Sequence, residues 1–111
     1  MITVIIATLA DKNLNNLIQK LHKEALIKKI ILSVPYDSNN KNFNYKSKKK
    51  FVLYNSIKHQ VKQRIKASLK VKTKFTLYLD DDVIFDQFFI EKLYKFKLKM
   101  GENSIVGPIY Y

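Results

Sequence analysis

The sequence predicts an α/β domain with a mostly parallel sheet and flanking helices. Runs of apolar, often β-branched residues alternate along the chain with stretches whose apolar residues recur every three or four positions. Hydrophobic residues make up 47% of the 111 residues, and only 2 Gly and 2 Pro interrupt them, so the chain has the material for a packed core. No internal repeat is present. Because strand and helix patterns alternate, we expect residues 1–111 to form one domain of this class.

The first part of the chain predicts a strand, a helix and a second strand. Residues 1–7 form a continuous apolar run, which is typical of a strand buried on both faces in the middle of a parallel sheet. Residues 14–26 carry the apolar stripe of an amphipathic helix. Residues 30–34 are again apolar and end at Pro35, before a turn-forming segment. We therefore expect a βαβ unit with a right-handed crossover.

The second part predicts a loop, a short strand, two helices and two further strands. Residues 39–50 are rich in Lys and Asn and predict a loop, and residues 51–54 predict a short strand. Apolar residues at every fourth position predict a helix over 57–69, with lysines on its other face: Ile57, Val61, Ile65 and Leu69 against Lys58, Lys62, Lys66 and Lys70.

The last elements surround an acidic triplet. Residues 75–79 predict a strand that runs directly into Asp80. A third amphipathic helix is expected from about Gln87, with its apolar stripe facing the sheet and Gly101 ending it. The stripe is formed by Phe89, Ile90, Leu93, Phe96 and Lys97. Residues 105–111 predict a final strand.

Charge and cysteine content restrict the function classes. The formal net charge is +12, which favours an anionic partner such as nucleic acid or a membrane surface. However, 20 of the 21 basic residues are Lys and only Arg64 is Arg, whereas recognition of phosphates and bases favours Arg. We interpret the charge mainly as a solvated lysine coat, with the cytoplasmic face of a membrane as its functional use. The absence of Cys excludes disulfides and thiolate sites and fits a cytoplasmic location.

Asp80, Asp81 and Asp82 are the strongest candidate site in the sequence. They follow five apolar residues directly, so they place three negative charges at the end of a predicted strand. Neighbouring carboxylates repel one another unless a cation compensates their charge. Oxygen ligands suit Mg²⁺ or Mn²⁺, which keep several waters and bridge to substrate phosphates. The triplet therefore predicts a divalent metal site that binds a diphosphate.

At these residues the chain resembles family 2 glycosyltransferases of the GT-A fold. The segment Leu79-Asp80-Asp81-Asp82-Val83 is similar to the DXD motif of that family. The segment His59-Gln60-Val61-Lys62-Gln63-Arg64 is similar to the Q-x-x-Q-R helix that often precedes the motif. The resemblance covers nearly all of the chain but only about half of the family's domain. It implies the N-terminal, nucleotide-sugar-binding half of a GT-A domain that stops after the DXD region, with the catalytic base beyond the C-terminus.

The resemblance also implies roles for individual residues. Ala7 and Thr8 would line the nucleotide pocket, and Asp37 would hydrogen-bond the base or ribose. Gln63 or Arg64 would help to hold the nucleotide. Asp80 and Asp81 would lie against the ribose and sugar, and Asp82, with Asp81, would coordinate the metal. The donor would be a uridine diphosphate sugar, and the acceptor a polysaccharide or lipid-linked glycan.

Three alternatives stay open at this point. A fragment of this kind could bind a nucleotide sugar without transferring the sugar, because transfer needs further groups. A phosphatase of the haloacid dehalogenase type also uses D-x-D after an apolar strand, although that motif normally closes the first strand. A basic nucleic-acid-binding module is favoured by the charge and by 14 aromatic residues, but the chain contains no recognised motif of such modules. Asp37 could equally be a turn former.

Overall fold

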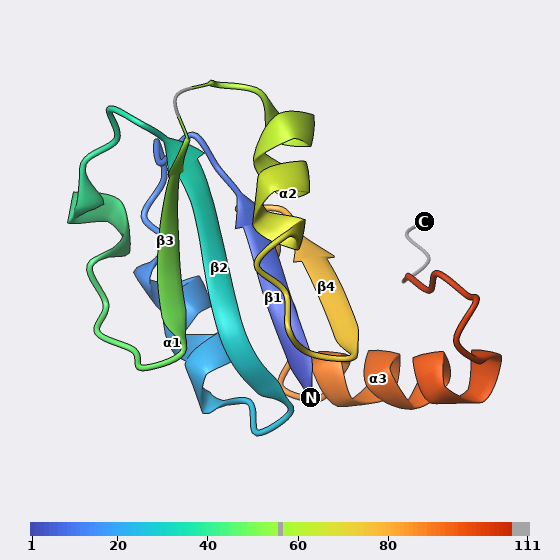
Figure 1. Ribbon diagram of the computed structural model, residues 1–111. Coiled ribbons are helices and arrows are strands. Elements are labelled where there is room, and N and C mark those ends of the chain that lie inside the picture. The colour runs from blue at the N-terminus through green and yellow to red at the C-terminus, as the bar shows by residue number, and fades with distance from the viewer. Residues whose placement is uncertain (56, 108–111) are drawn as a thin grey trace.

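Four parallel strands form the centre of the computed structural model, which describes residues 1–55 and 57–107. The strands are β1 (Ile2–Ala7), β2 (Ile27–Pro35), β3 (Lys50–Asn55) and β4 (Phe75–Leu79). They are arranged in the order β3-β2-β1-β4, with all pairs parallel (Figure 1). Each predicted strand from residue 1 to residue 79 is present. Every residue of β1 is buried, as expected for an inner strand with covered faces.

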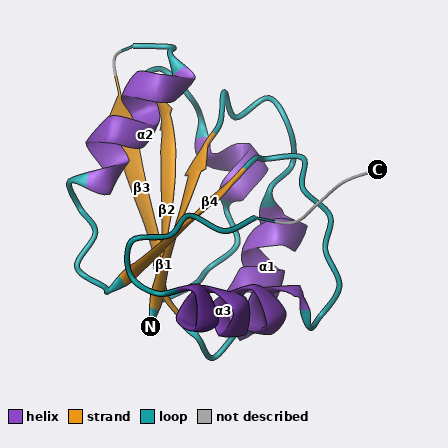
Figure 2. Cartoon of the chain, turned by 90° about the vertical axis from the view of Figure 1, so that its right-hand side faces the viewer, coloured by secondary structure: helices purple, strands orange, loops and turns teal. Residues whose placement is uncertain are grey.

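Helices cover both faces of this sheet, which confirms the predicted α/β class. The helices α1 (Asn15–Lys23) and α3 (Phe89–Met100) lie on one face, and α2 (Gln60–Ser68) lies alone on the other (Figure 2). The main core lies between the sheet and α1, where Leu14, Ile18 and Leu21 are fully buried. On the α2 face the core is much smaller, with Ile5, Ile31 and Ala67 at its centre. The architecture is Rossmann-like, and its strand order is that of the first four strands of such folds.

The predicted helix α2 is present, but it begins at Gln60, three residues later than predicted, and its apolar stripe faces solvent. Such a stripe normally packs on the core. Here Val61, Ile65 and Leu69 are 55%, 57% and 79% exposed, while Gln63 and Ala67 are buried against the sheet. Hydrogen bonding explains this orientation. The Gln63 side chain donates to buried backbone carbonyls at the ends of two strands, and it can do so only when its side of the helix faces the sheet.

The remaining elements differ from prediction mainly at their ends. β2 begins at Ile27, three residues earlier than expected, because α1 ends at Lys23 and a short turn leads into the strand. α3 begins at Phe89 instead of about Gln87, and it ends before Gly101, whose φ of 89° favours glycine. Its stripe is only partly buried, since Ile90 is enclosed but Phe96 is 48% exposed. Residues 105–107 form no strand, and the rest of the predicted strand at 105–111 lies outside the described residues.

Two lysines of the predicted basic loop have structural partners. The loop contains a short 3-10 helix, η1 (Asn40–Phe43), whose Phe43 is buried in the main core. The Lys49 ammonium donates to the carbonyls of His22 and Glu24, both at 2.8 Å. The Lys50 ammonium donates to loop carbonyls, and burial lowers the pKa of Lys50. Lys49 therefore holds the loop to the end of α1, and Lys50 holds it to the start of β3.

Candidate functional site

The candidate site lies where the strand order of the sheet reverses. β1 has β2 on one side and β4 on the other, although β4 is the last of the four strands in the chain. In open α/β sheets, ligands bind outside the carboxyl ends of the strands at such a reversal. The residues that follow β1 and β4 here are Thr8 and the acidic triplet, which begins at Asp80. Two segments that are 73 positions apart in the chain thus meet at the place where this fold binds ligands.

A short hydrogen bond joins these two strand ends. The Thr8 hydroxyl donates to Oδ2 of Asp81 at 2.6 Å, and it accepts from the Ala10 backbone N–H at 3.1 Å. Thr8 is fully buried, so its hydroxyl cannot exchange these partners for water. Ala10 has a φ of 61°, the left-handed region that L-residues seldom occupy. The hydroxyl of Thr8 therefore both orients Asp81 and holds a strained turn after β1.

The three aspartates of the triplet have different surroundings. Asp80 is 68% exposed and pairs with Nη2 of Arg64 at 3.0 Å. Asp81 is 16% exposed and, besides Thr8, pairs with the Lys12 ammonium at 3.5 Å. Asp82 is exposed. Consecutive residues at a strand end point in different directions, so the triplet does not form one compact carboxylate cluster.

Asp81 and Asp82 nevertheless line the same cavity, of about 490 Å³, beside α1. The cavity is mainly polar, and α1 together with the turn before it supplies amide and ammonium groups. These other polar lining residues are Asn13, Asn16, Gln19, Lys20 and Lys23. Carboxylate and amide oxygens can hold a divalent cation that keeps some of its waters, and lysines can contact phosphate oxygens. The cavity has the mixed charge that a metal–diphosphate group requires.

The predicted Mg²⁺ or Mn²⁺ site was tested against the arrangement of candidate ligands. Within residues 1–55 and 57–107, no group of three or more His, Cys, Asp or Glu side chains converges as a metal site. The available set is two carboxylates with side-chain amide oxygens from α1 and the turn before it. Mg²⁺ is commonly bound by only one or two carboxylates together with substrate phosphates. The donor set therefore fits a cation that arrives with a diphosphate better than a permanently caged ion.

Gln63 and Arg64 lie on different sides of α2. The Gln63 side-chain amide donates to the backbone carbonyls of Thr8 at 3.1 Å and Ser33 at 2.7 Å, and the Ser33 hydroxyl donates to the backbone carbonyl of Gln63. Gln63 is fully buried and holds the carboxyl ends of β1 and β2 together. Arg64 instead reaches the surface and contacts Asp80. Of this predicted pair, only Arg64 has its side chain at the surface beside the acidic triplet.

Ala7 and Asp37 contribute differently. Ala7 is the buried last residue of β1 and places Thr8. Asp37 is exposed in the turn after β2, where the Ser38 N–H donates to the Pro35 carbonyl. Within the described part of the chain, Asp37 has neither a hydrogen bond nor an ion pair to the triplet. Sequence reasoning missed Lys12, Lys20 and Ser33, whose roles depend on long-range contacts that no local pattern indicates.

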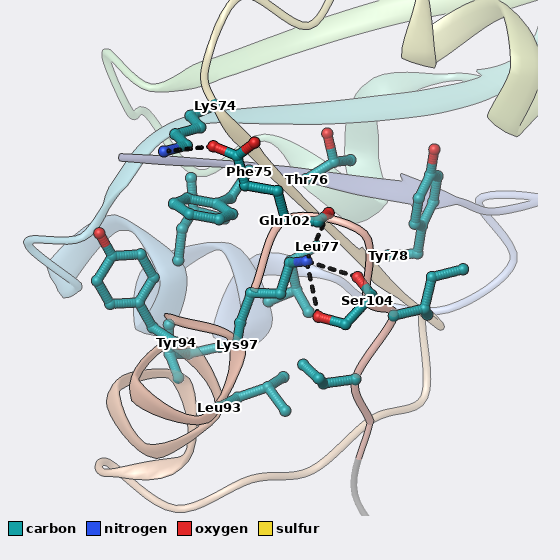
Figure 3. A pocket seen from close by; sticks show the side chains of 14 residues that line it. Lys74, Phe75, Thr76, Leu77, Tyr78, Leu93, Tyr94, Lys97, Glu102 and Ser104 are labelled. Carbon is teal, nitrogen blue, oxygen red and sulfur yellow. Dashed lines mark hydrogen bonds and ion pairs between the residues drawn. The ribbon is translucent and has the colours of Figure 1, made fainter. Parts of the chain in front are cut away.

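A second cavity, of about 540 Å³, has none of the three aspartates in its lining (Figure 3). It is bounded by β4, α3 and the segment after α3, and its lining is mainly apolar, including Phe75, Leu77 and Tyr94. The Lys97 ammonium donates to the carbonyls of Gly101, Glu102 and Ser104 and so fixes that segment. This cavity offers little chemistry for a diphosphate, and we regard the cavity at Asp81 and Asp82 as the candidate site.

Comparison with family models, curated proteins and solved structures found no match to this chain. None of the described helices is both long and apolar enough to cross a lipid bilayer.

Proposed function

We propose that the chain binds a nucleoside diphosphate sugar at the carboxyl ends of β1 and β4, as the donor-binding part of a GT-A glycosyltransferase similar to family 2. The observation that carries the proposal is the hydrogen bond from Thr8 to Asp81 across the reversal of strand order. It supports the assignment because a strand-end carboxylate held by a buried hydroxyl has a fixed direction, which a solvated acidic turn lacks. The sequence resemblance at Asp80–Asp82 supports the same assignment.

In this proposal, the oxygen ligands around the cavity bind the metal ion, and the lysines around it bind the diphosphate. Asp81 and Asp82, with amide oxygens of α1 and the preceding turn, would hold Mg²⁺ or Mn²⁺. A bound metal would neutralise the charge that develops on the leaving nucleoside diphosphate. Lys20 and Lys23, which line the same cavity, would contact phosphate oxygens. Arg64 would keep Asp80 turned toward the ribose and sugar side through the 3.0 Å ion pair.

The nucleoside is proposed to lie toward the ends of β1 and β2. Ala7 and Thr8 would form its floor, and Asp37 would reach the base or ribose from the turn after β2. Gln63 would act indirectly, because its amide holds the carbonyls of Thr8 and Ser33 in place. The proposals of a uridine donor and of a polysaccharide or lipid-linked acceptor rest only on the sequence resemblance to family 2 glycosyltransferases.

Calorimetric titration of UDP tests the proposal. We expect binding in Mn²⁺ that disappears when EDTA replaces the metal. Asp82→Ala should weaken the metal-dependent binding by at least roughly tenfold, the size seen when groups that orient a metal are removed. Asp11→Asn is the matched control, because Asp11 is an exposed carboxylate in the loop after β1. Equal affinity of the wild-type chain and Asp82→Ala would reject Asp82 as a metal ligand, and no UDP binding in either condition would reject the donor site.

Binding and transfer are separate claims. If UDP binds, incubation with UDP-sugars and measurement of released UDP distinguishes a transferring or hydrolysing enzyme from a fragment that only binds. The phosphatase alternative predicts hydrolysis of p-nitrophenyl phosphate in Mg²⁺. Its acidic motif normally follows the first strand, whereas here the acidic triplet follows β4 and its first aspartate pairs with Arg64. That placement favours the nucleotide-sugar proposal.

A further inference from the structure

The net positive charge of the chain is confined to one segment. Residues 38–79 contain 12 of the 21 basic residues and no Asp or Glu. The other nine basic residues are balanced by the nine acidic residues, so the formal net charge of +12 belongs entirely to this segment. It comprises β3, α2 and β4 with their connections. An even lysine coat would not leave the rest of the chain neutral, and the segment therefore has a strongly positive potential of its own.

An apolar stripe lies on the outer side of α2 in the same segment. Ile57, Val61, Ile65 and Leu69 are 40%, 55%, 57% and 79% exposed. α2 lies alone on its face of the sheet, so no other helix of the described chain covers its outer side (Figure 2). Scattered exposed apolar residues are common on protein surfaces, but Val61 and Ile65 lie one turn apart on α2, Leu69 follows at its C-cap, and Ile57 precedes the helix by three residues.

The helical rotation places this stripe opposite the sheet. Successive residues of an α-helix are rotated by about 100°, so Ile65 points away from the side that Gln63 and Ala67 bury. Lys62 and Lys66 then lie along one flank of the stripe, and both are exposed. On the other flank, Arg64 points to Asp80. The outer side of α2 is thus an apolar row beside Lys62 and Lys66, and exposed Lys58 and Lys70 lie just before and just after the helix.

We propose that the outer side of α2, together with the exposed residues just before and after it from Ile57 to Lys70, docks on an anionic lipid surface. The apolar stripe would enter the boundary between headgroups and acyl chains, and the lysines would contact lipid phosphates. Charge complementarity favours an anionic surface, and the exposed Ile, Val and Leu side chains favour lipid over nucleic acid, which offers them no apolar layer. The use of Lys instead of Arg also suits diffuse attraction to a charged surface better than bidentate base recognition.

Vesicle sedimentation of the full chain tests this inference. At physiological ionic strength, we expect binding to phosphatidylcholine vesicles that contain about one third phosphatidylglycerol, and no binding to pure phosphatidylcholine. Val61→Ser with Ile65→Ser should lower the partition coefficient more than tenfold, because both side chains are exposed and contribute to the patch. Lys58→Gln with Lys62→Gln should lower it by roughly fivefold for each lysine. Circular dichroism checks that each variant keeps the wild-type fold.

Matched substitutions on the opposite side of the sheet provide the control. Lys92→Gln with Lys99→Gln removes the same charge from α3, where both lysines are exposed, and should leave the partition coefficient within twofold of the wild-type value. No binding to the anionic vesicles, or equal loss in the α2 and α3 lysine pairs, overturns the inference. Binding of a DNA duplex that survives Val61→Ser with Ile65→Ser, without vesicle binding, assigns the face to nucleic acid instead. UDP titration is independent of all these outcomes.

Discussion

Replacing Thr8 with Val is the sharpest perturbation of the candidate site. Valine has nearly the same shape as threonine, so the change removes the buried hydroxyl with little effect on packing. The hydroxyl makes a 2.6 Å bond to the Asp81 carboxylate and accepts the Ala10 N–H at 3.1 Å. A hydrogen bond to a charged group contributes about 1.5–3 kcal/mol and a neutral one about 1 kcal/mol. We expect Thr8→Val to lower the free energy of unfolding by about 2–4 kcal/mol.

Thr8→Ser separates the hydroxyl from the methyl group. It keeps both hydrogen bonds and deletes one buried methyl, which should lower the free energy of unfolding by only about 1 kcal/mol. Urea denaturation followed by circular dichroism measures all three proteins. In addition, Thr8→Val should weaken metal-dependent UDP binding because Asp81 loses its fixed direction, while Thr8→Ser should retain it. A Thr8→Val protein that is as stable as Thr8→Ser would refute a structural role for the Thr8–Asp81 bond.

Two further predictions concern polar groups that hold the backbone. Gln63→Leu should lower the free energy of unfolding by about 2–4 kcal/mol in urea denaturation, because two buried strand-end carbonyls, of Thr8 and Ser33, lose a donor; an unchanged midpoint would contradict this role. Lys49→Met should lower it by about 1–2 kcal/mol through loss of two carbonyl bonds, whereas Lys48→Met, at an exposed loop position, should change it by less than about 0.5 kcal/mol. Equal midpoints for the two lysine variants would show that the Lys49 bonds contribute nothing.

The sequence predicted the fold well because the strands carry strong local signals. β1 and residues 30–34 of β2 are the apolar runs of the sequence, and the structure buries both in the middle of the sheet, as that pattern requires. The strand order β3-β2-β1-β4 was not predicted, because the rule for βαβ units gives the hand of a crossover and not the position of a later strand. The prediction was less informative for α2, because periodicity identifies a helix but not the side that it buries. That side depends on Gln63, whose partners are 30 and 55 positions away in the chain.

The candidate site was only partly visible in the sequence. The acidic triplet stands out because it follows an apolar strand directly, and the structure brings it against Thr8, the first residue after β1. The different surroundings of Asp80 and Asp81 could not be predicted, since Thr8 and Lys12 reach Asp81 from the turn after β1 and Arg64 reaches Asp80 from α2. The sequence therefore located the carboxylates, while the long-range contacts determine that Asp80 pairs with Arg64 and that Asp81 is held by Thr8 where it lines the cavity.

The helix α2 joins the two proposed activities through three consecutive residues. Gln63 faces the sheet and ties the ends of β1 and β2, Arg64 faces Asp80 at the candidate site, and Ile65 faces outward in the apolar stripe. Because successive residues of a helix are rotated by about 100°, burial of Gln63 determines the directions of Arg64 and Ile65. Docking through Ile65 would consequently place Arg64 and Asp80 beside the lipid surface instead of beneath it. The donor site would stay open to solvent while its edge lies close to the membrane, which is the arrangement that a lipid-linked acceptor would require.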